Sequence, residues 1–173
     1  TFSEIGFGLH GRTLISKGFS ITYSGFITNG LTADVILNNE GRTFLPAGKS
    51  EEMFAEDNNG SPATSARVAA IFDFGEIGFS HYRCVYNNFK SEGIEIAPAR
   101  LLTISAADIS IKFNKLRIDG EAAYNTIEVP ENISEMFGSR QWGAYLDISY
   151  PLYTFSFLRF QSVIISGIIR FEA

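Results

Sequence analysis

Few residues of this 173-residue chain could do chemistry, and His81 and Cys84 are the closest pair. An imidazole and a thiol three positions apart suggest a metal site, or a nucleophile with its base. The alternating pattern around them predicts a strand, in which positions three apart point to opposite faces. We therefore expect a polar strand residue and a small buried thiol, not a shared site.

The remaining candidate motifs also lack the context that their chemistry needs. Gly6–Gly11 has the spacing G-x-G-x-x-G, but it does not follow a strand and no βαβ pattern surrounds it. His10 lies inside this glycine-rich stretch, and no Gly-x-Ser-x-Gly segment accompanies it. An acidic cluster lacks the ordered spacing of a calcium loop; it consists of Glu51, Glu52, Glu56 and Asp57. We expect no enzyme activity, no catalytic residue, no metal and no cofactor.

Composition narrows the possible partners. The net charge is −5 and no basic run is present, which argues against nucleic acid and against membrane binding by charge alone. The single cysteine excludes an intrachain disulfide. No segment reaches the ~18 apolar residues of a transmembrane helix, and the N-terminus does not resemble a signal peptide. Localisation stays open between secretion by a non-standard route and a place in a particle.

The elements that must position these residues are strands. Sixteen Phe and seven Tyr favour them, and alternation of apolar and polar residues is the dominant pattern. The predicted strands include Phe19 to Tyr23, Thr32 to Leu37, Arg67 to Phe74, Ile77 to Tyr86, Ile109 to Phe113, Leu116 to Ile118, Trp142 to Tyr150, Tyr153 to Phe157 and Val163 to Phe171. Helical signals are limited to Ser50 to Phe54 and Asn132 to Glu135.

Three details refine this expectation. The phase shift at Asn114–Lys115 indicates a β-bulge, and Pro151 is expected to end its strand. The last run, from Val163, is apolar on both faces, which predicts burial from both sides. The fold class is therefore all-β with one or two short helices: a single β-sandwich domain over residues 19–173 after a flexible segment, residues 1–18.

The aromatic residues suggest a binding surface. Tyr82 and Tyr86 share a strand face with Ser80, and Trp142 follows in a later strand. We expect most of these rings to be core, whereas any that are half exposed would suit sugar stacking or the lipid headgroup region.

Several collinear segments resemble the actinoporins, the pore-forming cytolysins of sea anemones, and their wider cytolysin/lectin superfamily. Asp34-Val-Ile-Leu37 is similar to a strand of that family, and Pro46-Ala-Gly-Lys49 is similar to the turn after it. Phe79-Ser80 resembles the segment before the family's aromatic membrane loop, and Asn132-Ile-Ser134 followed by Trp142 resembles a stretch near its C-terminus.

The resemblance implies a β-sandwich that binds a phosphocholine headgroup, oligomerises and forms a pore. By position, Ser80 matches a headgroup-contacting serine and Tyr124 a headgroup-contacting tyrosine. In the family an amphipathic N-terminal helix lines the pore. Here Phe2, Ile5 and Leu9 would share one face of such a helix, although four glycines within residues 1–18 disfavour it.

Two hypotheses follow. The first is a membrane- or glycan-binding cytolysin/lectin-type protein that oligomerises, with a ligand site formed by Ser80, Tyr82, Tyr86, Tyr124 and Trp142. The alternative is a structural jelly-roll subunit of a virion, such as a capsid, spike or fibre head, that self-associates. A monomer that assembles only on lipid would favour the first, and a stable assembly without lipid would favour the second.

Overall fold

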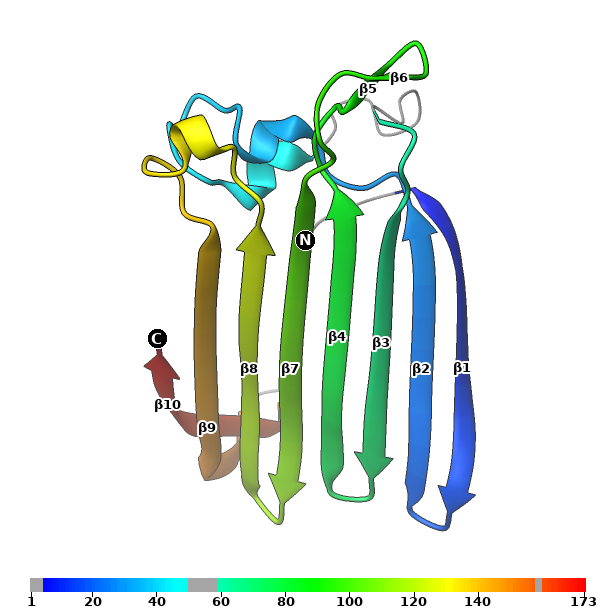
Figure 1. The fold of residues 1–173 in the computed structure, drawn as a ribbon. Coiled ribbons are helices and arrows are strands. Elements are labelled where there is room, and N and C mark those ends of the chain that lie inside the picture. Colours follow the sequence, from blue (N-terminus) through cyan, green and yellow to red (C-terminus); the bar gives the residue numbers. More distant parts are fainter. Residues whose placement is uncertain (1–4, 50–58, 158–159) are drawn as a thin grey trace.

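In the computed structural model, residues 5–49, 59–157 and 160–173 are described, and eight long strands account for most of them. Neighbouring strands are antiparallel and run in the order β1-β2-β3-β4-β7-β8-β9-β10 (Figure 1). The strands are β1 Gly6–Ser16, β2 Phe19–Thr28, β3 Ala63–Phe72, β4 Gly75–Val85, β7 Leu101–Phe113, β8 Leu116–Ile127, β9 Arg140–Phe157 and β10 Phe160–Glu172. The predicted all-β class is confirmed.

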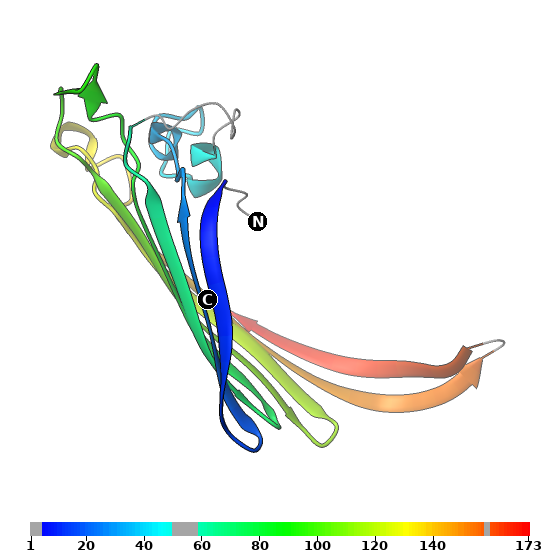
Figure 2. The ribbon, with the colours of Figure 1, turned by 90° about the vertical axis from the view of Figure 1, so that its right-hand side faces the viewer.

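The eight strands form one continuous, curved sheet. A β-sandwich would place two sheets face to face, whereas here the only second sheet among the described residues is the short hairpin of β5 Lys90–Ser91 and β6 Ile94–Glu95. Toward their shared turn, β9 and β10 bend away from the plane of the other strands (Figure 2). The sheet therefore has a convex and a concave side.

The two ends of the sheet differ. Two-residue turns join β1 to β2, β3 to β4 and β7 to β8 at one end, which we call the turn end. At the other end, the loop end, residues 29–62, 86–100 and 128–139 make the connections (Figure 1). The helical segments of these loops are 3-10 turns, at η1 Ala33–Val35, η2 Leu45–Gly48 and η3 Glu131–Ile133.

The buried core lies at the loop end. Val35 and Leu102 are fully buried there, beside Cys84 and Tyr86. Thr43 Oγ1 donates to the carbonyl of Gly138 at 2.8 Å, which links two loops that are far apart in sequence. This cluster fixes the loops against the strand ends, and among the described residues it does not extend over the middle of the sheet.

The prediction of a strand at Thr32 to Leu37 is wrong. This segment contains the 3-10 helix η1, and the Thr32 side chain caps it by accepting from the backbone N–H of Asp34 at 3.4 Å. Val35 and Ile36 are buried in the loop-end core. Their apolar side chains therefore pack in this core and do not form part of a sheet face. Local capping and burial together outweigh the β-propensity of the segment.

The expected bulge at Asn114–Lys115 is also wrong, because these residues form the turn of the β7–β8 hairpin. Phe113 pairs with Leu116 directly across it. Asn114 has φ = 56°, a conformation that asparagine tolerates better than most residues. A two-residue turn shifts the phase of alternation just as a bulge does, so the pattern alone did not distinguish them.

Residues 6–16, expected to lie in a flexible segment, instead form β1, which pairs with β2 along its length. The G-x-G-x-x-G spacing thus lies on a strand. Pro151 does not end its strand either: β9 continues through it, and the register shifts where Pro151 faces Ser166. A proline that lacks an N–H donor is tolerated at such an irregularity.

The last strand is exposed rather than buried from both sides. Ile164, Ile165, Ile168 and Ile169 are between 51% and 66% exposed, because β10 lies at the edge of a single-layered sheet and pairs only with β9. The predicted helical segment at Ser50 to Phe54 and the acidic cluster lie outside the described residues. The signal at Asn132 to Glu135 corresponds to η3 and the turn after it.

Candidate functional site

The strand register sorts the side chains of the sheet into two contrasting faces. Directly paired residues of neighbouring strands point to the same side, and successive residues alternate. Phe7, for example, pairs with Ile27, and Val68 pairs with both Tyr23 and Phe79. Following these pairs from β1 to β10 assigns each described strand residue outside the register shifts to one face.

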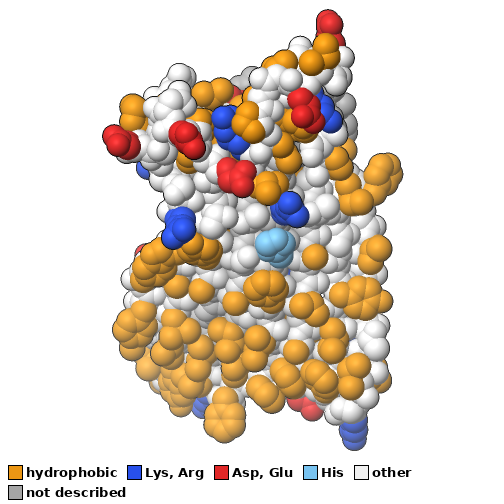
Figure 3. Space-filling view, viewed as in Figure 1, with side chains coloured by type: hydrophobic (Ala, Val, Ile, Leu, Met, Phe, Trp, Pro, Cys, Tyr) orange, Lys and Arg blue, Asp and Glu red, His pale blue; other side chains and the backbone are white. Residues whose placement is uncertain are grey.

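One face, here the apolar face, carries large hydrophobic side chains on every long strand. They include Phe7, Leu9, Tyr23, Ile27, Val68, Ile77, Phe79, Ile109, Ile111, Ile118, Leu146, Ile148, Ile169 and Phe171. Phe79 is 50% exposed and Ile169 is 61% exposed. Figure 3 shows hydrophobic side chains spread over the strands, with charged ones gathered near the two ends.

Aromatic residues border the apolar face at both ends. Near the turn end, Phe72 stacks between Phe19 and Phe74, at 5.0 and 5.2 Å between ring centroids. Near the loop end, Tyr124 pairs with Trp142, which is 69% exposed. From Leu116 to Tyr124 the apolar stretch of β8 covers about 27 Å, at ~3.4 Å per residue.

Charged residues lie on the apolar face only beyond the loop-end aromatics. Among its described strand residues these are Arg83 and Arg140. They belong to one row of paired residues, Arg83, Thr103, Thr126 and Arg140, that crosses four strands. The hydroxyl oxygens of Thr103 and Thr126 lie 2.6 Å apart within this row. We call these four residues the border row.

The opposite face, the polar face, carries the other charged strand residues of the large sheet. They are Arg12, Arg67, Glu76, Asp108, Lys112, Arg117, Asp119, Glu121, Asp147, Arg170 and Glu172. The β9–β10 hairpin bends toward this side, since it lies behind the sheet when the apolar face is viewed from the front (Figures 1 and 3). The polar face is therefore the concave one.

Arg67 is the centre of one ion-pair network on the polar face. Its Nη2 donates to Glu76 Oε1 and to Asp108 Oδ2, both at 2.7 Å. The hydrogen bond to Glu76 raises the pKa of the guanidinium above its ordinary value. These contacts connect β3, β4 and β7 through side chains.

A second group of ion pairs lies on β8, β9 and β10. The guanidinium of Arg117 lowers the pKa of Asp119, which also accepts from Ser110 Oγ at 2.7 Å. Arg170 donates to both carboxylate oxygens of Asp147 at 2.6 Å and lowers the pKa of that group. The lowered pKa values favour the charged form of these two carboxylates, Asp119 and Asp147.

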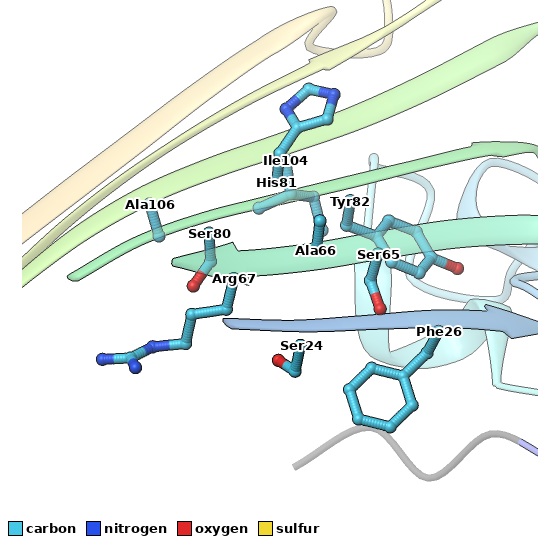
Figure 4. A pocket seen from close by; sticks show the side chains of 10 residues that line it. All are labelled: Ser24, Phe26, Ser65, Ala66, Arg67, Ser80, His81, Tyr82, Ile104 and Ala106. Atoms are coloured by element: carbon cyan, nitrogen blue, oxygen red, sulfur yellow. The ribbon is translucent and has the colours of Figure 1, made fainter. Parts of the chain in front are cut away.

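A shallow hollow of about 290 Å³ lies on the polar face between these networks and the loop end. Ser24, Phe26, Arg67, Ser80, Tyr82 and Ile104 are among its lining residues (Figure 4). Figure 4 also shows the ring of His81 pointing to the opposite side from Arg67 and Ser80. Ser80 and Tyr82 thus both lie on the polar face, in a hollow that Phe26 and Ile104 also line.

The five predicted site residues lie in three places. Ser80 and Tyr82 lie in the hollow of the polar face, while Tyr124 and Trp142 are neighbours on the apolar face. Tyr86 is buried in the loop-end core, where its hydroxyl donates to the carbonyl of Glu128 at 2.6 Å and burial raises its pKa to about 12. The pair Tyr124–Trp142 is the part of the predicted site that remains together and exposed.

The separation of His81 and Cys84 is confirmed. His81 is exposed on the apolar face, with Nδ1 3.0 Å from Ser105 Oγ, and Cys84 is buried on the other side. Across the described ranges, no three His, Cys, Asp or Glu residues are grouped so that they could hold a metal ion. A search of the same ranges for a helix long and apolar enough to cross a membrane finds none.

Sequence reasoning missed the two-faced character of the whole sheet. The signal was present in the parity of charged positions: Arg67, Asp108 and Asp119 each alternate with apolar neighbours. Only the strand register shows that these residues lie on the same side of the sheet and form one charged surface. Comparison with known proteins adds no further constraint, because no family model, curated protein or solved structure matches this chain.

Proposed function

We propose that this chain is an integral membrane protein whose strands cross a lipid bilayer. The apolar face contacts the hydrocarbon, and the polar face lines a water-containing interior that lets small polar solutes pass. The observation that carries this proposal is the sorting of charge among the described strand residues: the apolar face holds charged ones only in the border row, whereas the polar face holds them on seven of the eight long strands.

The extent of the apolar face supports lipid as its partner. Proteins surrounded by water rarely expose contiguous apolar patches larger than a few hundred Å². Here exposed Phe, Ile, Leu and Val side chains extend from β1 to β10, as Phe7 at 89% and Phe171 at 58% exposure illustrate. A surface of this kind is stable only when something apolar covers it.

The dimensions of the face fit a bilayer. Strands need about 9–11 residues to cross the hydrocarbon when they tilt, and the long strands here are at least that long. The aromatic residues at both ends, with Tyr124 and Trp142 next to charged and hydroxyl groups, lie where rings favour the membrane–water interface. Short turns at one end and long loops at the other complete this pattern.

The polar face suits an aqueous interior. Its Arg–carboxylate pairs, such as Arg67 with Glu76 and Asp108, are only partly buried and need water or one another. Both signs of charge occur on it. The proposal thus keeps the membrane partner and the pore that the resemblance to actinoporins implies, and it assigns them to the sheet.

The single Trp allows a direct test. We expect the emission of Trp142 to shift to the blue when the protein is folded into phosphatidylcholine vesicles. Lipids brominated near the headgroup should quench it more strongly than lipids brominated near the chain ends. Vesicles that contain the protein should also conduct ions across a planar bilayer after fusion.

A matched pair of neighbouring alanines tests the two faces separately. Ala107 lies on the apolar face and Ala106 on the polar face of β7. In a Trp142→Phe background, Ala107→Trp should be quenched by brominated chains, and Ala106→Trp should be quenched by aqueous iodide instead. The proposal is wrong if one reagent quenches the two introduced tryptophans equally. It is also wrong if the protein forms a stable assembly without lipid in which neither tryptophan is reached by lipid or iodide.

A further inference from the structure

We infer that the border row binds the phosphate groups of anionic lipids. This inference rests on the proposed membrane function and deepens it by naming a lipid class and its contact residues. The row consists of Arg83, Thr103, Thr126 and Arg140, which are consecutive pairing partners on β4, β7, β8 and β9.

The position of the row is that of lipid headgroups. The neighbouring row, one step toward the middle of the sheet on the same face, contains His81, Ser105, Tyr124 and Trp142. Aromatic rings of Tyr and Trp prefer the headgroup level. The border row lies two residues farther out along each strand, about 7 Å, where the phosphates begin.

The two arginines lack an internal carboxylate. Within the ranges that the structure describes, Arg42, Arg67, Arg117 and Arg170 form salt bridges, whereas Arg83 and Arg140 form none. Both side chains are exposed. A guanidinium with its donors unused, at a lipid surface, binds phosphate oxygens through two parallel hydrogen bonds.

The spacing along the row defines the ligand further. Three strand intervals of ~4.8 Å separate the two arginine positions, about 14 Å in all. The paired Thr103 and Thr126 hydroxyls lie between them. The row therefore accommodates two phosphate groups, from neighbouring anionic lipids or from one lipid with two phosphates, while the hydroxyls contact the headgroup between them. Because the whole chain has a net charge of −5, we expect the attraction to anionic lipid to come from this row and not from the overall charge of the protein.

The test compares vesicles of phosphatidylcholine with vesicles that also contain phosphatidylglycerol. We expect the wild type to partition more strongly into the anionic vesicles. Each arginine near the surface contributes about a fivefold preference, so the double variant Arg83→Gln/Arg140→Gln should lose about 30-fold of it. Arg12→Gln, on the polar face and also without a salt bridge among the described residues, is the matched control and should keep the full preference.

Two further readouts keep the conclusions separate. Quenching of Trp142 by brominated phosphatidylcholine reports membrane insertion in vesicles without anionic lipid. If Trp142 of the wild-type protein is not quenched in these vesicles, the proposed function is wrong. If Trp142 is quenched but Arg83→Gln/Arg140→Gln retains the anionic preference, the inference about the border row is wrong. Inorganic phosphate should not compete; abolition of the preference by phosphate at constant ionic strength would assign the row to a soluble anion.

Discussion

At the scale of single residues, adjacent side chains of one strand lie on opposite faces and meet different surroundings. Phe79 is half exposed on the apolar face, while Ser80 lines the hollow of the polar face beside Arg67. About a third of the Arg67, Glu76 and Asp108 side chains stays exposed, so solvent screens their ion pairs and each adds only modestly to stability. The cost of placing a charge on the wrong face is larger, because hydrocarbon provides no partner.

Neighbouring alanines on β8 measure this cost. Ala122 lies on the apolar face and Ala123 on the polar face. Ala122 lies one step inside the Tyr124–Trp142 row, so we expect Ala122→Arg to lower the free energy of unfolding from vesicles by about 1–3 kcal/mol, and Ala123→Arg by less than about 1 kcal/mol. Urea titration of each variant in phosphatidylcholine vesicles measures the difference. Equal losses would mean that the two faces meet the same environment.

At the scale of elements, the short turns fix which residues pair. Asn114 and Lys115 connect β7 to β8, and the backbone of Asn114 at φ = 56° sets the pairing of Phe113 with Leu116. Register matters here because a slip by one residue would move every charge of β8 to the apolar face. Arg117, Asp119 and Glu121 would then point into lipid.

The positive φ at Asn114 gives a prediction for this turn. Asn114→Val should destabilise the protein by about 1–2 kcal/mol, since a branched side chain clashes in this conformation. Asn114→Gly should be close to neutral. Lys115→Val is the control, because Lys115 lies in the same turn without a positive φ. Urea unfolding of the three variants tests this expectation, and it fails if both valine variants behave alike.

At the scale of the whole molecule, the sheet leaves two edges unpaired. The outer edges of β1 and β10 present backbone N–H and C=O groups that have no strand partner among the described residues. In hydrocarbon each such group costs several kcal/mol, so both edges must be paired when the sheet crosses a bilayer. The bend of β9 and β10 toward the concave side leads β10 out of the plane of the sheet (Figure 2).

Hydrogen exchange tests the fate of these edges. We expect the amides of β1 and β10 to exchange much faster than those of β3 and β4 in urea-free buffer without lipid. After folding into vesicles, all four strands should be protected to a similar degree. Persistent fast exchange of β1 and β10 in vesicles that quench Trp142 would show that the edges stay open, contrary to this expectation.

The sequence by itself determined the all-β class, most strand positions and the separation of His81 from Cys84, because alternation with a period of two is a local property of the chain. It also singled out Tyr124 and Trp142. Only the tertiary structure decided that Thr32 to Leu37 is a capped loop, that β9 passes through Pro151, and that the large strands form one sheet with a charged and an apolar face. The two faces of the sheet depend on register between distant segments, such as Arg67 with Asp108, 41 positions apart, which no local pattern contains.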